Sequence, residues 1–328
     1  MKKSYNVTYF YRSIHSSFSI KKVTQTITSH INNKEEFFVP YTGVSLKAIL
    51  GNIVAVYRKR NKMGINHVTG EIHYCVLGLI GCKSVLTIHD TVSLDFHSGS
   101  KFKKLILEWF WYRIPLKIAT KVICISEATK RSVEKYTKRR DLVVIHNAVD
   151  PYIEYSEEDL RPIPTILFIG TNPNKNLERC FNALNGIRCS VTIIGKLTPK
   201  QIECLKQNQI TYVNKYGLTD QEVRDEYKKC NVVSFCSLFE GFGMPIIEAN
   251  KAGRAVITSS ISVLKEIGGD SVYYVNPEKV EDIRAGYCKL LTDVTFRMEL
   301  VKKGIEHVKQ YDYLRILPQW LNVYESIK

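Results

Sequence analysis

The 328-residue sequence lacks the short motifs that identify the commonest nucleotide-dependent enzymes. Neither a G-x-x-x-x-G-K-[ST] loop nor a G-x-G-x-x-G fingerprint follows a strand-like run, so nothing supports an ATPase or a dehydrogenase. The histidines and acidic residues show no metal-ligand spacing, and we therefore expect no bound metal. Nine cysteines occur without a C-x-x-C pair. They predict reduced thiols in the core, with no disulfide framework and no zinc site.

Long apolar runs are also missing. No stretch of about eighteen apolar residues is available to cross a bilayer. The start, residues 1–7, leads into a strand-like run and not into the apolar region of a signal peptide. These two features lead us to expect a cytoplasmic protein.

Acidic residues are scarce in the first half of the chain. Residues 1–150 contain 24 Lys and Arg against 10 Asp and Glu, a net charge of +14. The remaining residues contribute only +1 to the total of +15. Such an excess in one half predicts an anionic partner for that half. This partner could be nucleic acid, anionic lipid or a phosphorylated acceptor, and composition does not distinguish these three.

Short runs rich in Val and Ile alternate with longer helical stretches along the chain. Strands buried on both faces of a parallel sheet have this composition, and the alternation predicts two doubly wound sheets in an α/β fold. The predicted strands are Val7–Tyr11, Ile53–Tyr57, Ile72–Leu77, Val85–Ile88, Val122–Ile125, Leu142–Ile145, Thr165–Ile169, Val191–Ile194, Ile210–Val213, Val232–Phe235, Ala255–Thr258 and Val272–Val275. The segment 147–164, with Asp150-Pro151, an acidic run and two further prolines, predicts a linker between domains at 1–150 and 151–311.

The strongest signal for chemistry follows the predicted strand Val232–Phe235. Glu-Gly-Phe-Gly-Met-Pro occupies 240–245, and Glu248 lies eight positions after Glu240. Pro245 suits the first helical position, so we expect Glu248 in the first helical turn. A glycine loop that leads into a helix presents backbone N–H groups to phosphate, and the two carboxylates can accept from hydroxyls, as a nucleotide sugar requires. On spacing alone, a glycine turn that caps a core helix is an equally good interpretation.

The motif at 240–248 resembles the E-x7-E signature of the retaining glycosyltransferases of family four, which have the GT-B fold. The resemblance covers most of the chain and includes Phe18–Ile20, Thr87–Asp90, Ile125–Lys130, His146–Asp150, Phe168–Thr171, Lys175–Leu177, Leu264–Glu266 and Gly268–Gly269. It implies two Rossmann-like domains that face each other across a cleft. Residues 1–150 would be the acceptor domain, completed by a crossover helix within 312–328, and 151–311 would be the donor domain.

The family resemblance also implies roles for individual residues. Glu248 would bind the ribose hydroxyls, and Glu240 would lie beside the transferred sugar and the scissile bond. Lys175 would neutralise the diphosphate, which stabilises the leaving group. His89 would lie on the acceptor side of the sugar. The implied donor-binding set is Gly170, Thr171, Lys175, Gly241, Phe242, Gly243, Met244 and Glu248.

Two positions depart from the family pattern. The arginine that many relatives carry after the glycine of the second-domain strand is Thr171 here, so diphosphate binding would depend on Lys175 and the helix N-terminus. The glycine-rich loop expected after the first strand is replaced by Arg12–Ser17. Arg12 or His15 could contact substrate there, although a solvated loop is the favoured interpretation.

A basic and aromatic segment in the first half allows two interpretations. Lys101–Lys104 precedes Leu105–Lys117, which contains Trp, Phe and Tyr. This combination suits an anionic membrane interface, although a core helix with a basic solvated end is the favoured interpretation. Basic residues at 130–140 extend the positive surface.

Together these features predict a retaining, metal-independent transfer of a sugar from a nucleoside diphosphate to a saccharide. The acceptor would be lipid-linked and used for a surface polysaccharide such as lipopolysaccharide, with the enzyme peripheral on the inner membrane. A nucleotide-sugar epimerase or hydrolase of the same fold is the alternative. A nucleic-acid-binding protein would also explain the charge, but no recognised nucleic-acid module is present.

Overall fold

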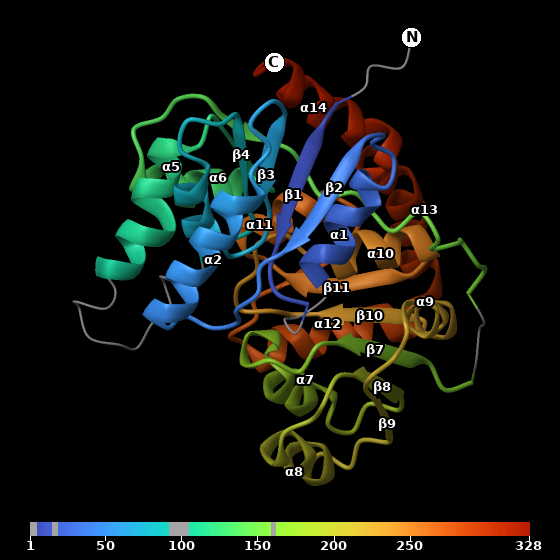
Figure 1. Cartoon of the computed structure of the whole chain (residues 1–328). Helices are drawn as coiled ribbons and strands as arrows, with labels where there is room; N and C mark the ends of the chain where they lie inside the picture. Colours follow the sequence, from blue (N-terminus) through green and yellow to red (C-terminus); the bar gives the residue numbers. More distant parts are fainter. Residues whose placement is uncertain (1–4, 15–18, 92–104, 159–161) are drawn as a thin grey trace. The chain divides into compact units, whose positions relative to one another are not determined.

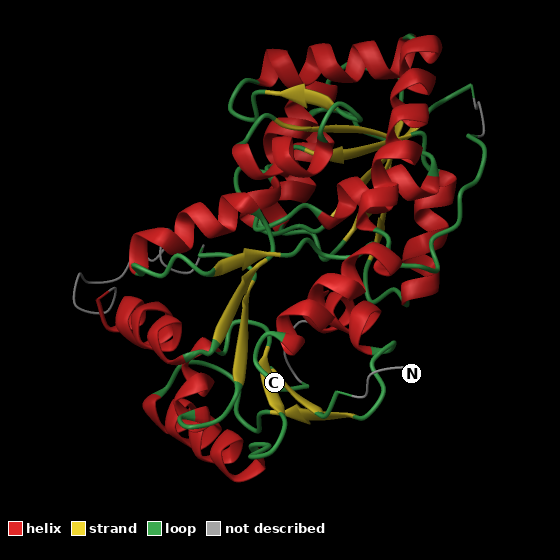
Figure 2. Cartoon of the chain, turned by 90° about the horizontal axis from the view of Figure 1, so that it is seen from above, coloured by secondary structure: helices red, strands yellow, loops and turns green. Residues whose placement is uncertain are grey.

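The computed structural model describes residues 5–14, 19–91, 105–158 and 162–328. The chain divides into two compact units. The first comprises Met1–Ala148 with Tyr311–Lys328, and the second comprises Val149–Gln310. Each unit contains a parallel sheet with helices on both faces (Figures 1 and 2). The two doubly wound sheets predicted from the sequence are therefore confirmed.

The sheet of the first unit contains six parallel strands. Their order is β2 (Lys34–Phe38), β1 (Val7–Tyr11), β3 (Ile65–Val68), β4 (Ser84–Ile88), β5 (Lys121–Cys124) and β6 (Leu142–Val144). The helices are α1 (Ser19–Thr28), α2 (Leu46–Lys59), η1 (His73–Leu79), η2 (Glu108–Arg113), α5 (Ile114–Ile118), α6 (Glu127–Val133), η3 (Glu134–Tyr136), η5 (Lys309–Tyr311, which bridges the two units) and α14 (Tyr313–Glu325). Side chains of β1 alternate between two cores, one under α1 and α14 and the other under α2, η1, η2 and α5 (Figure 1).

Two of the predicted strands in the first unit are wrong. Ile53–Tyr57 lies inside α2, and Ile72–Leu77 lies mostly in the 3-10 helix η1. The β-branched run at 53–57 belongs to a helix because only one side of it is buried, with Val56 inside and Tyr57 exposed. The strands β2 and β3 were not predicted. Both carry polar residues, β2 because it lies at the sheet edge and β3 because it buries a polar pair, Asn66 and His67.

A buried polar chain attaches α14 to the first sheet. The Tyr324 hydroxyl lies 2.9 Å from the Tyr9 hydroxyl and 2.7 Å from His67 Nδ1, and His67 Nε2 lies 2.7 Å from Thr87 Oγ1. Burial lowers the pKa of His67 to about 3, so the ring is neutral and has one donor and one acceptor nitrogen. The last helix thus belongs to the first unit.

The second unit repeats the architecture with the strand order β12 (Tyr273–Val275), β11 (Ala255–Ser259), β10 (Val232–Phe235), β7 (Thr165–Ile169), β8 (Ser190–Ile194) and β9 (Tyr212–Lys215). Its helices are η4 (Pro173–Lys175), α7 (Leu177–Leu184), α8 (Pro199–Gln207), α9 (Asp220–Lys229), α10 (Met244–Ala252), α11 (Ser262–Gly268), α12 (Val280–Thr292) and α13 (Val294–Val308). All six strands were predicted, with β9 two residues later than expected.

The acidic run predicted as part of a linker is fastened to the second unit. Glu158 and Arg297 of α13 form an ion pair of 2.8 Å, with side chains only 2% and 3% exposed. Asn231 Nδ2 donates to the same carboxylate oxygen at 2.7 Å, and Arg297 also donates to the Leu290 carbonyl oxygen at 2.6 Å. Removing one partner of such a pair leaves a buried charge without compensation.

We expect Arg297→Met to destabilise the second unit by about 3 to 5 kcal/mol, since the Glu158 carboxylate would remain buried. The exposed pair of Lys303 and Asp270, at 3.5 Å, provides the control. Lys303→Met should change the free energy of unfolding by less than about 0.5 kcal/mol. Urea unfolding followed by circular dichroism measures both. Equal effects of the two substitutions would contradict this account.

Candidate functional site

The predicted donor residues gather at the carboxyl edge of the second sheet. Strands β7 and β10 are adjacent and parallel, so the segments that follow Ile169 and Phe235 leave the sheet at the same edge. In doubly wound sheets this edge is where ligands bind. The first segment contains η4, and the second contains the glycine loop that leads into α10.

An ion pair joins these two segments. Lys175 Nζ lies 2.6 Å from Glu240 Oε1, and both side chains are largely buried. Asn174 Nδ2 donates to the same oxygen at 3.1 Å. The lysine also lies over the ring of Phe235, 4.6 Å from its centroid. The carboxylate and the ammonium group are therefore held at one point on the sheet edge.

Backbone geometry makes room for this pair. Gly170 has a φ of +86°, and a Cβ there would lie 3.0 Å from Lys175 Cε. Asn176 has a φ of 59° and closes η4 before α7 begins. Its Nδ2 donates to the carbonyl oxygens of Cys236 and Pro277 at 3.2 and 2.7 Å. These bonds attach the loop after β7 to the ends of β10 and β12.

The glycine loop ends at Gly243, which begins α10 with a φ of +119°. A Cβ at this position would lie 2.8 Å from Leu264 Cδ2 of α11, so the loop packs closely on its neighbour. Pro245 lies in the first turn, where its missing N–H has no cost. Glu248 is the fifth residue of the helix and starts the second turn, which corrects the predicted first-turn position.

Glu248 accepts a hydrogen bond from a residue that sequence analysis missed. The Tyr227 hydroxyl of α9 donates to Glu248 Oε2 at 2.7 Å. Burial and the charge of Glu248 raise the pKa of Tyr227, so it stays protonated and remains a donor. The fully buried Arg254 holds α9 in place, because it donates to the carbonyl oxygens of Tyr227 and Lys228 at 3.0 and 2.7 Å. No local pattern marks Tyr227 or Arg254 as part of a site.

The structure therefore brings Gly170, Lys175 and Glu240 together and places the loop 241–244 at the start of α10. Thr171 is engaged elsewhere: its hydroxyl donates to the Lys196 carbonyl oxygen at 2.8 Å. Sequence analysis predicted neither the contact between Lys175 and Glu240 nor the hydrogen bond that Asn174 donates to Glu240. Sequence spacing separates the two charged residues by 65 positions and gives no sign of their pairing.

His89 lies at the carboxyl end of β4 in the first unit and is 7% exposed. Burial, and to a lesser degree His73, lowers its pKa to about 3, so the ring is neutral near pH 7. Its Nε2 is buried and has no hydrogen-bond partner among the described residues. His73 lies 3.0 Å from the Trp111 carbonyl oxygen through Nδ1 and has a pKa lowered to about 4 by burial.

A cavity of about 150 Å³ lies beyond the carboxyl ends of β1 and β3. Arg12 lines it and donates to Glu71 at 3.0 Å, so this side chain is half-buried and does not belong to a simply solvated loop. His15 lies outside the described residues. The cavity wall also contains residues 41–44, Tyr74 and Trp111.

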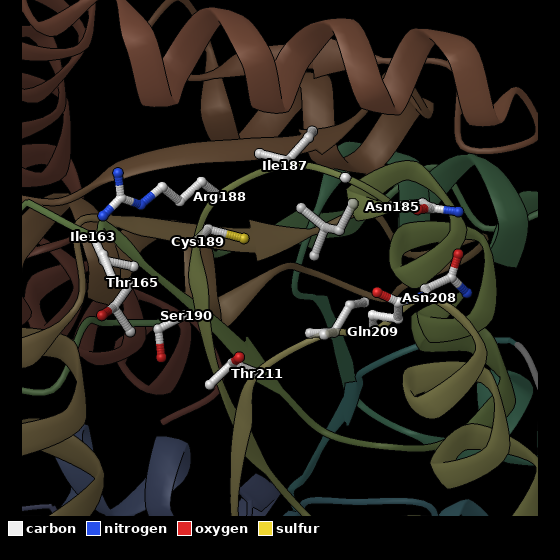
Figure 3. A pocket seen from close by; sticks show the side chains of 13 residues that line it. Ile163, Thr165, Asn185, Ile187, Arg188, Cys189, Ser190, Asn208, Gln209 and Thr211 are labelled. Carbon is white, nitrogen blue, oxygen red and sulfur yellow. The ribbon is translucent and has the colours of Figure 1, made fainter.

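A larger cavity, of about 610 Å³, lies at the opposite edge of the second sheet (Figure 3). Thr165 and Ser190, the first residues of β7 and β8, line it together with Arg188 and Gln209. None of the predicted donor residues contributes to it. The cavity is therefore separate from the edge that carries the ion pair.

Among the residues that the structure describes, no group of three or more His, Cys, Asp or Glu side chains is arranged to hold a metal ion. Within the same part of the chain, none of the helices combines the length and the apolarity needed to cross a membrane.

Two family models match successive parts of the chain. Residues 37–152 match the model "Glycosyltransferase Family 4", and residues 163–293 match "Glycosyl transferases group 1". The first match covers β3 to β6 of the first sheet, and the second covers all six strands of the second sheet. The chain is a glycosyltransferase with the GT-B fold.

Sequence relatives of this glycosyltransferase include an uncharacterised glycosyltransferase of Methanocaldococcus jannaschii, 26% identical over 77% of this chain and 72% of the relative. The serotype-specific mannosyltransferase WbdA of Escherichia coli is 31% identical over 60% of this chain, and the match spans only 27% of WbdA. O-antigen chain mannosyltransferases of Escherichia coli and Salmonella typhimurium also match. The chain is therefore related to O-antigen mannosyltransferases.

Among solved structures, Anabaena HepE in complex with UDP and glucose has the same fold. Its TM-score is 0.78 at 14% sequence identity, with 98% of this chain and all of HepE covered. At this identity the similarity establishes the fold.

The backbone conformation at the start of α10 gives a prediction for the glycosyltransferase. Gly243→Ala should destabilise the second unit by roughly 2 to 4 kcal/mol, because the new methyl group meets Leu264 and the backbone has a φ of +119°. Gly186 has a φ of +71° and no atom within 4 Å of a Cβ, so Gly186→Ala isolates the backbone cost of about 1 kcal/mol. Urea unfolding measures both, and equal losses would show that the contact with Leu264 is unimportant.

The buried histidines predict that acid destabilises the first unit. His67, His73 and His89 bind protons near pH 6.5 when unfolded but only near pH 3 to 4 when folded. The unfolded state therefore binds more protons between these values, and stability should fall as the pH drops from 7 to 5. Each histidine contributes up to about 1.4 kcal/mol per pH unit.

All three tryptophans, Trp109, Trp111 and Trp320, lie in the first unit, so urea unfolding monitored by tryptophan fluorescence follows that unit. His73→Gln should reduce the slope of stability against pH by about one proton. A slope unchanged by this substitution, or no loss of stability between pH 7 and 5, would disprove the prediction.

Proposed function

We propose that this glycosyltransferase moves a sugar from a nucleoside diphosphate sugar to a saccharide carried on a lipid, with retention of configuration and without a metal. The observation that carries the proposal is the Lys175–Glu240 pair beside the start of α10, at the carboxyl edge of the second sheet. A cation, a helix N-terminus and two separate carboxylates at this edge match the chemical groups of a nucleotide sugar.

The donor would be held by three parts of the second unit. Lys175 and the N-terminus of α10 would bind the diphosphate, since both attract negative charge. Glu248, oriented by the Tyr227 hydroxyl, would accept from the ribose hydroxyls. The loop 241–244 would lie against the sugar and the diphosphate through its backbone amides. The UDP in the HepE structure supports a nucleoside diphosphate as donor class.

Catalysis would depend on positioning and charge stabilisation. As the bond between the sugar and the diphosphate breaks, negative charge would grow on the leaving phosphate, and Lys175 would stabilise it. Glu240 would lie beside the sugar that is transferred. In the first unit, neutral His89 would contribute one hydrogen bond without adding charge, since its pKa is about 3.

The acceptor would be a lipid-linked saccharide for a surface polysaccharide at the inner membrane. The net charge of +14 over residues 1–150 supports an anionic partner for the first unit. The match to serotype-specific and O-antigen chain mannosyltransferases supports an acceptor of this class. Peripheral membrane binding and a cytoplasmic location belong to the same proposal.

The donor assignment predicts how nucleotides stabilise the enzyme against heat. Uridine or guanosine diphosphate should raise the melting temperature of the wild type, because a ligand that binds only the folded state stabilises it by mass action. Lys175→Met and Glu248→Gln should abolish most of the shift, while the exposed Lys206→Met on α8 should retain it. No shift with either nucleotide in the wild type, or an equal loss in the Lys206 control, would refute the donor site.

Glu240→Gln separates catalysis from binding. We expect it to keep the nucleotide-induced shift and to lower the turnover number by about 10² to 10³, as loss of a group that acts in the transition state does. Turnover is measured as release of nucleoside diphosphate with and without a saccharide acceptor. Release that needs no acceptor, or an isomerised donor sugar, would identify the hydrolase or epimerase alternative and refute the transferase assignment.

A further inference from the structure

The first unit exposes an apolar stripe along the outer side of α2. Leu46, Leu50, Val54 and Tyr57 are 72%, 53%, 45% and 55% exposed. Their spacing of four, four and three residues places them on one side of an α-helix. A stripe of this kind on a fixed helix differs from scattered single apolar residues and indicates an interaction surface.

The opposite side of α2 is firmly packed. Ala48, Asn52 and Val56 are buried against η1. Asn52 donates to the Tyr74 hydroxyl at 2.9 Å and also bonds both backbone groups of Tyr41 at 3.0 Å. The orientation of α2 is therefore fixed by the core, and its apolar stripe necessarily faces outward.

A second exposed apolar face lies at η2. Leu105, Ile106, Trp109 and Phe110 are between 42% and 50% exposed, whereas the next residue, Trp111, is buried. Trp111 fixes η2, because its Nε1 donates to the Glu71 carbonyl oxygen at 3.0 Å and its ring lies 4.7 Å from that of Tyr74.

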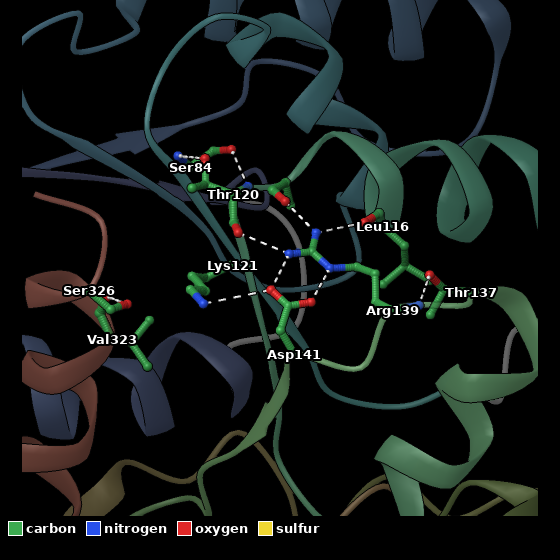
Figure 4. A network of polar contacts seen from close by, with 10 residues as sticks. Ser84, Leu116, Thr120, Lys121, Thr137, Arg139, Asp141, Val323 and Ser326 are labelled. Atoms are coloured by element: carbon green, nitrogen blue, oxygen red, sulfur yellow. Dashed lines mark hydrogen bonds and ion pairs between the residues drawn. The ribbon is translucent and has the colours of Figure 1, made fainter.

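The far end of this helical segment is also anchored (Figure 4). Arg139 binds Asp141 through two hydrogen bonds of 2.8 Å. The same guanidinium group donates to the carbonyl oxygens of Leu116, Ala119 and Thr120 at the end of α5. The segment that carries the exposed aromatic face is therefore anchored both at Trp111 and at the end of α5.

The segments that carry the two faces border the same 150 Å³ cavity. Its wall contains residues 41–44, which lead into α2, together with Leu107 and Trp111, which lie between and beside the exposed residues of the second face in sequence. Figure 1 shows α2 and the segment that ends in α5 on the same side of the first sheet. Arg12 and Glu71 line the cavity between them.

In the sequence, only basic residues accompany the apolar stripe on α2. Residues 37–70 contain five Lys and Arg and no Asp or Glu. Lys47, Arg58, Lys59 and Lys62 are exposed on α2 and the loop that follows it. Two copies of this surface would bring like charges together, whereas the headgroups of an anionic bilayer would complement them. Exposed leucine, tryptophan and tyrosine beside basic residues are typical of helices that lie in a membrane interface.

We propose that α2 and η2 form one membrane-docking surface, in which Leu46, Leu50 and Trp109 enter the interface of an anionic bilayer. This inference rests on the proposed function, since docking there would present the cavity at Arg12 to a saccharide carried on a lipid. To the proposed function, the inference adds which part of the first unit would contact the bilayer. The exposed apolar stripe on α2 and the absence of acidic residues over 37–70 carry it.

Vesicle flotation tests the surface with a matched pair of variants. Wild type should float with vesicles of equal parts phosphatidylcholine and phosphatidylglycerol, and weakly or not at all with phosphatidylcholine alone. Leu46→Asp should weaken binding by about ten-fold or more. Leu314→Asp is the control, because Leu314 is 66% exposed and also lies in the first turn of a helix, α14. Asp near a helix N-terminus is tolerated, so both variants should fold.

Trp109 reports the depth of insertion. It is 48% exposed, whereas Trp111 and Trp320 are 7% and 6% exposed. Phosphatidylcholine brominated on its acyl chains, mixed with phosphatidylglycerol, should quench the fluorescence of the wild type but not of Trp109→Phe. Quenching that persists in Trp109→Phe, no flotation with anionic vesicles, or equal losses in both Asp variants would overturn the proposal. A dimer in lipid-free solution that Leu46→Asp dissociates would also overturn it, in favour of a second copy.

Nucleotide stabilisation separates this proposal from the proposed function. A protein that binds nucleoside diphosphates but not vesicles would refute the docking surface and leave the donor site intact. A protein that docks through Leu46 and Trp109 but binds no nucleoside diphosphate would refute the proposed function and support the surface alone.

Discussion

The parallel order of the strands is the constraint on which the candidate site at the carboxyl edge of the second sheet depends. Because β7 and β10 are neighbours and run in the same direction, the chain leaves both at one edge of the sheet. Lys175 and Glu240 then come within 2.6 Å, although 65 residues separate them. An antiparallel pair would have placed the two segments at opposite edges. The ion pair is therefore a consequence of strand direction, and Gly170 and Asn176 supply the backbone conformations that allow it.

Behind this edge, a buried cation positions a carboxylate without touching it. Arg254 donates hydrogen bonds to backbone carbonyl oxygens at the end of α9, those of Tyr227 and Lys228. Tyr227 in turn donates to Glu248. A buried guanidinium group without such partners would be costly, so the carbonyl groups and the arginine stabilise one arrangement of α9 and α10. In the proposed function, this arrangement sets where the ribose is bound.

The first unit relies on buried polar groups that are uncharged, whereas the second unit buries the guanidinium group of Arg254. Inside the first unit, His67, His73 and His89 are kept neutral by burial, and the Tyr9–Tyr324–His67 chain attaches the last helix without any charge. Basic residues lie at its surface instead, among them Lys47, Arg58 and Lys59 on α2. The interior is thus suited to uncharged hydrogen bonding, and the surface to an anionic partner.

The sequence by itself determined the class of the fold and the residue types of the candidate site at the carboxyl edge of the second sheet. Strands with continuous Val and Ile, such as Val232–Phe235, were predicted because burial on both faces requires that composition. Sequence analysis wrongly predicted a strand at Ile53–Tyr57. A run of β-branched residues fits a strand, and only the packing of the folded chain shows that this run forms a helix buried on one side. Sequence analysis missed β3, whose buried Asn66 and His67 make hydrogen bonds to Lys83, Thr87 and Tyr324, all distant in sequence.

Only the tertiary structure decided how the predicted site residues are held. Glu240 and Glu248 stand eight positions apart in one motif, yet each is held by a donor from another element, Lys175 in one case and Tyr227 in the other. Hydrogen bonds and ion pairs act over about 3 Å in space and leave no local periodicity in sequence. The outward side of α2 was likewise decided by packing, because burial of Ala48, Asn52 and Val56 leaves its apolar stripe facing solvent.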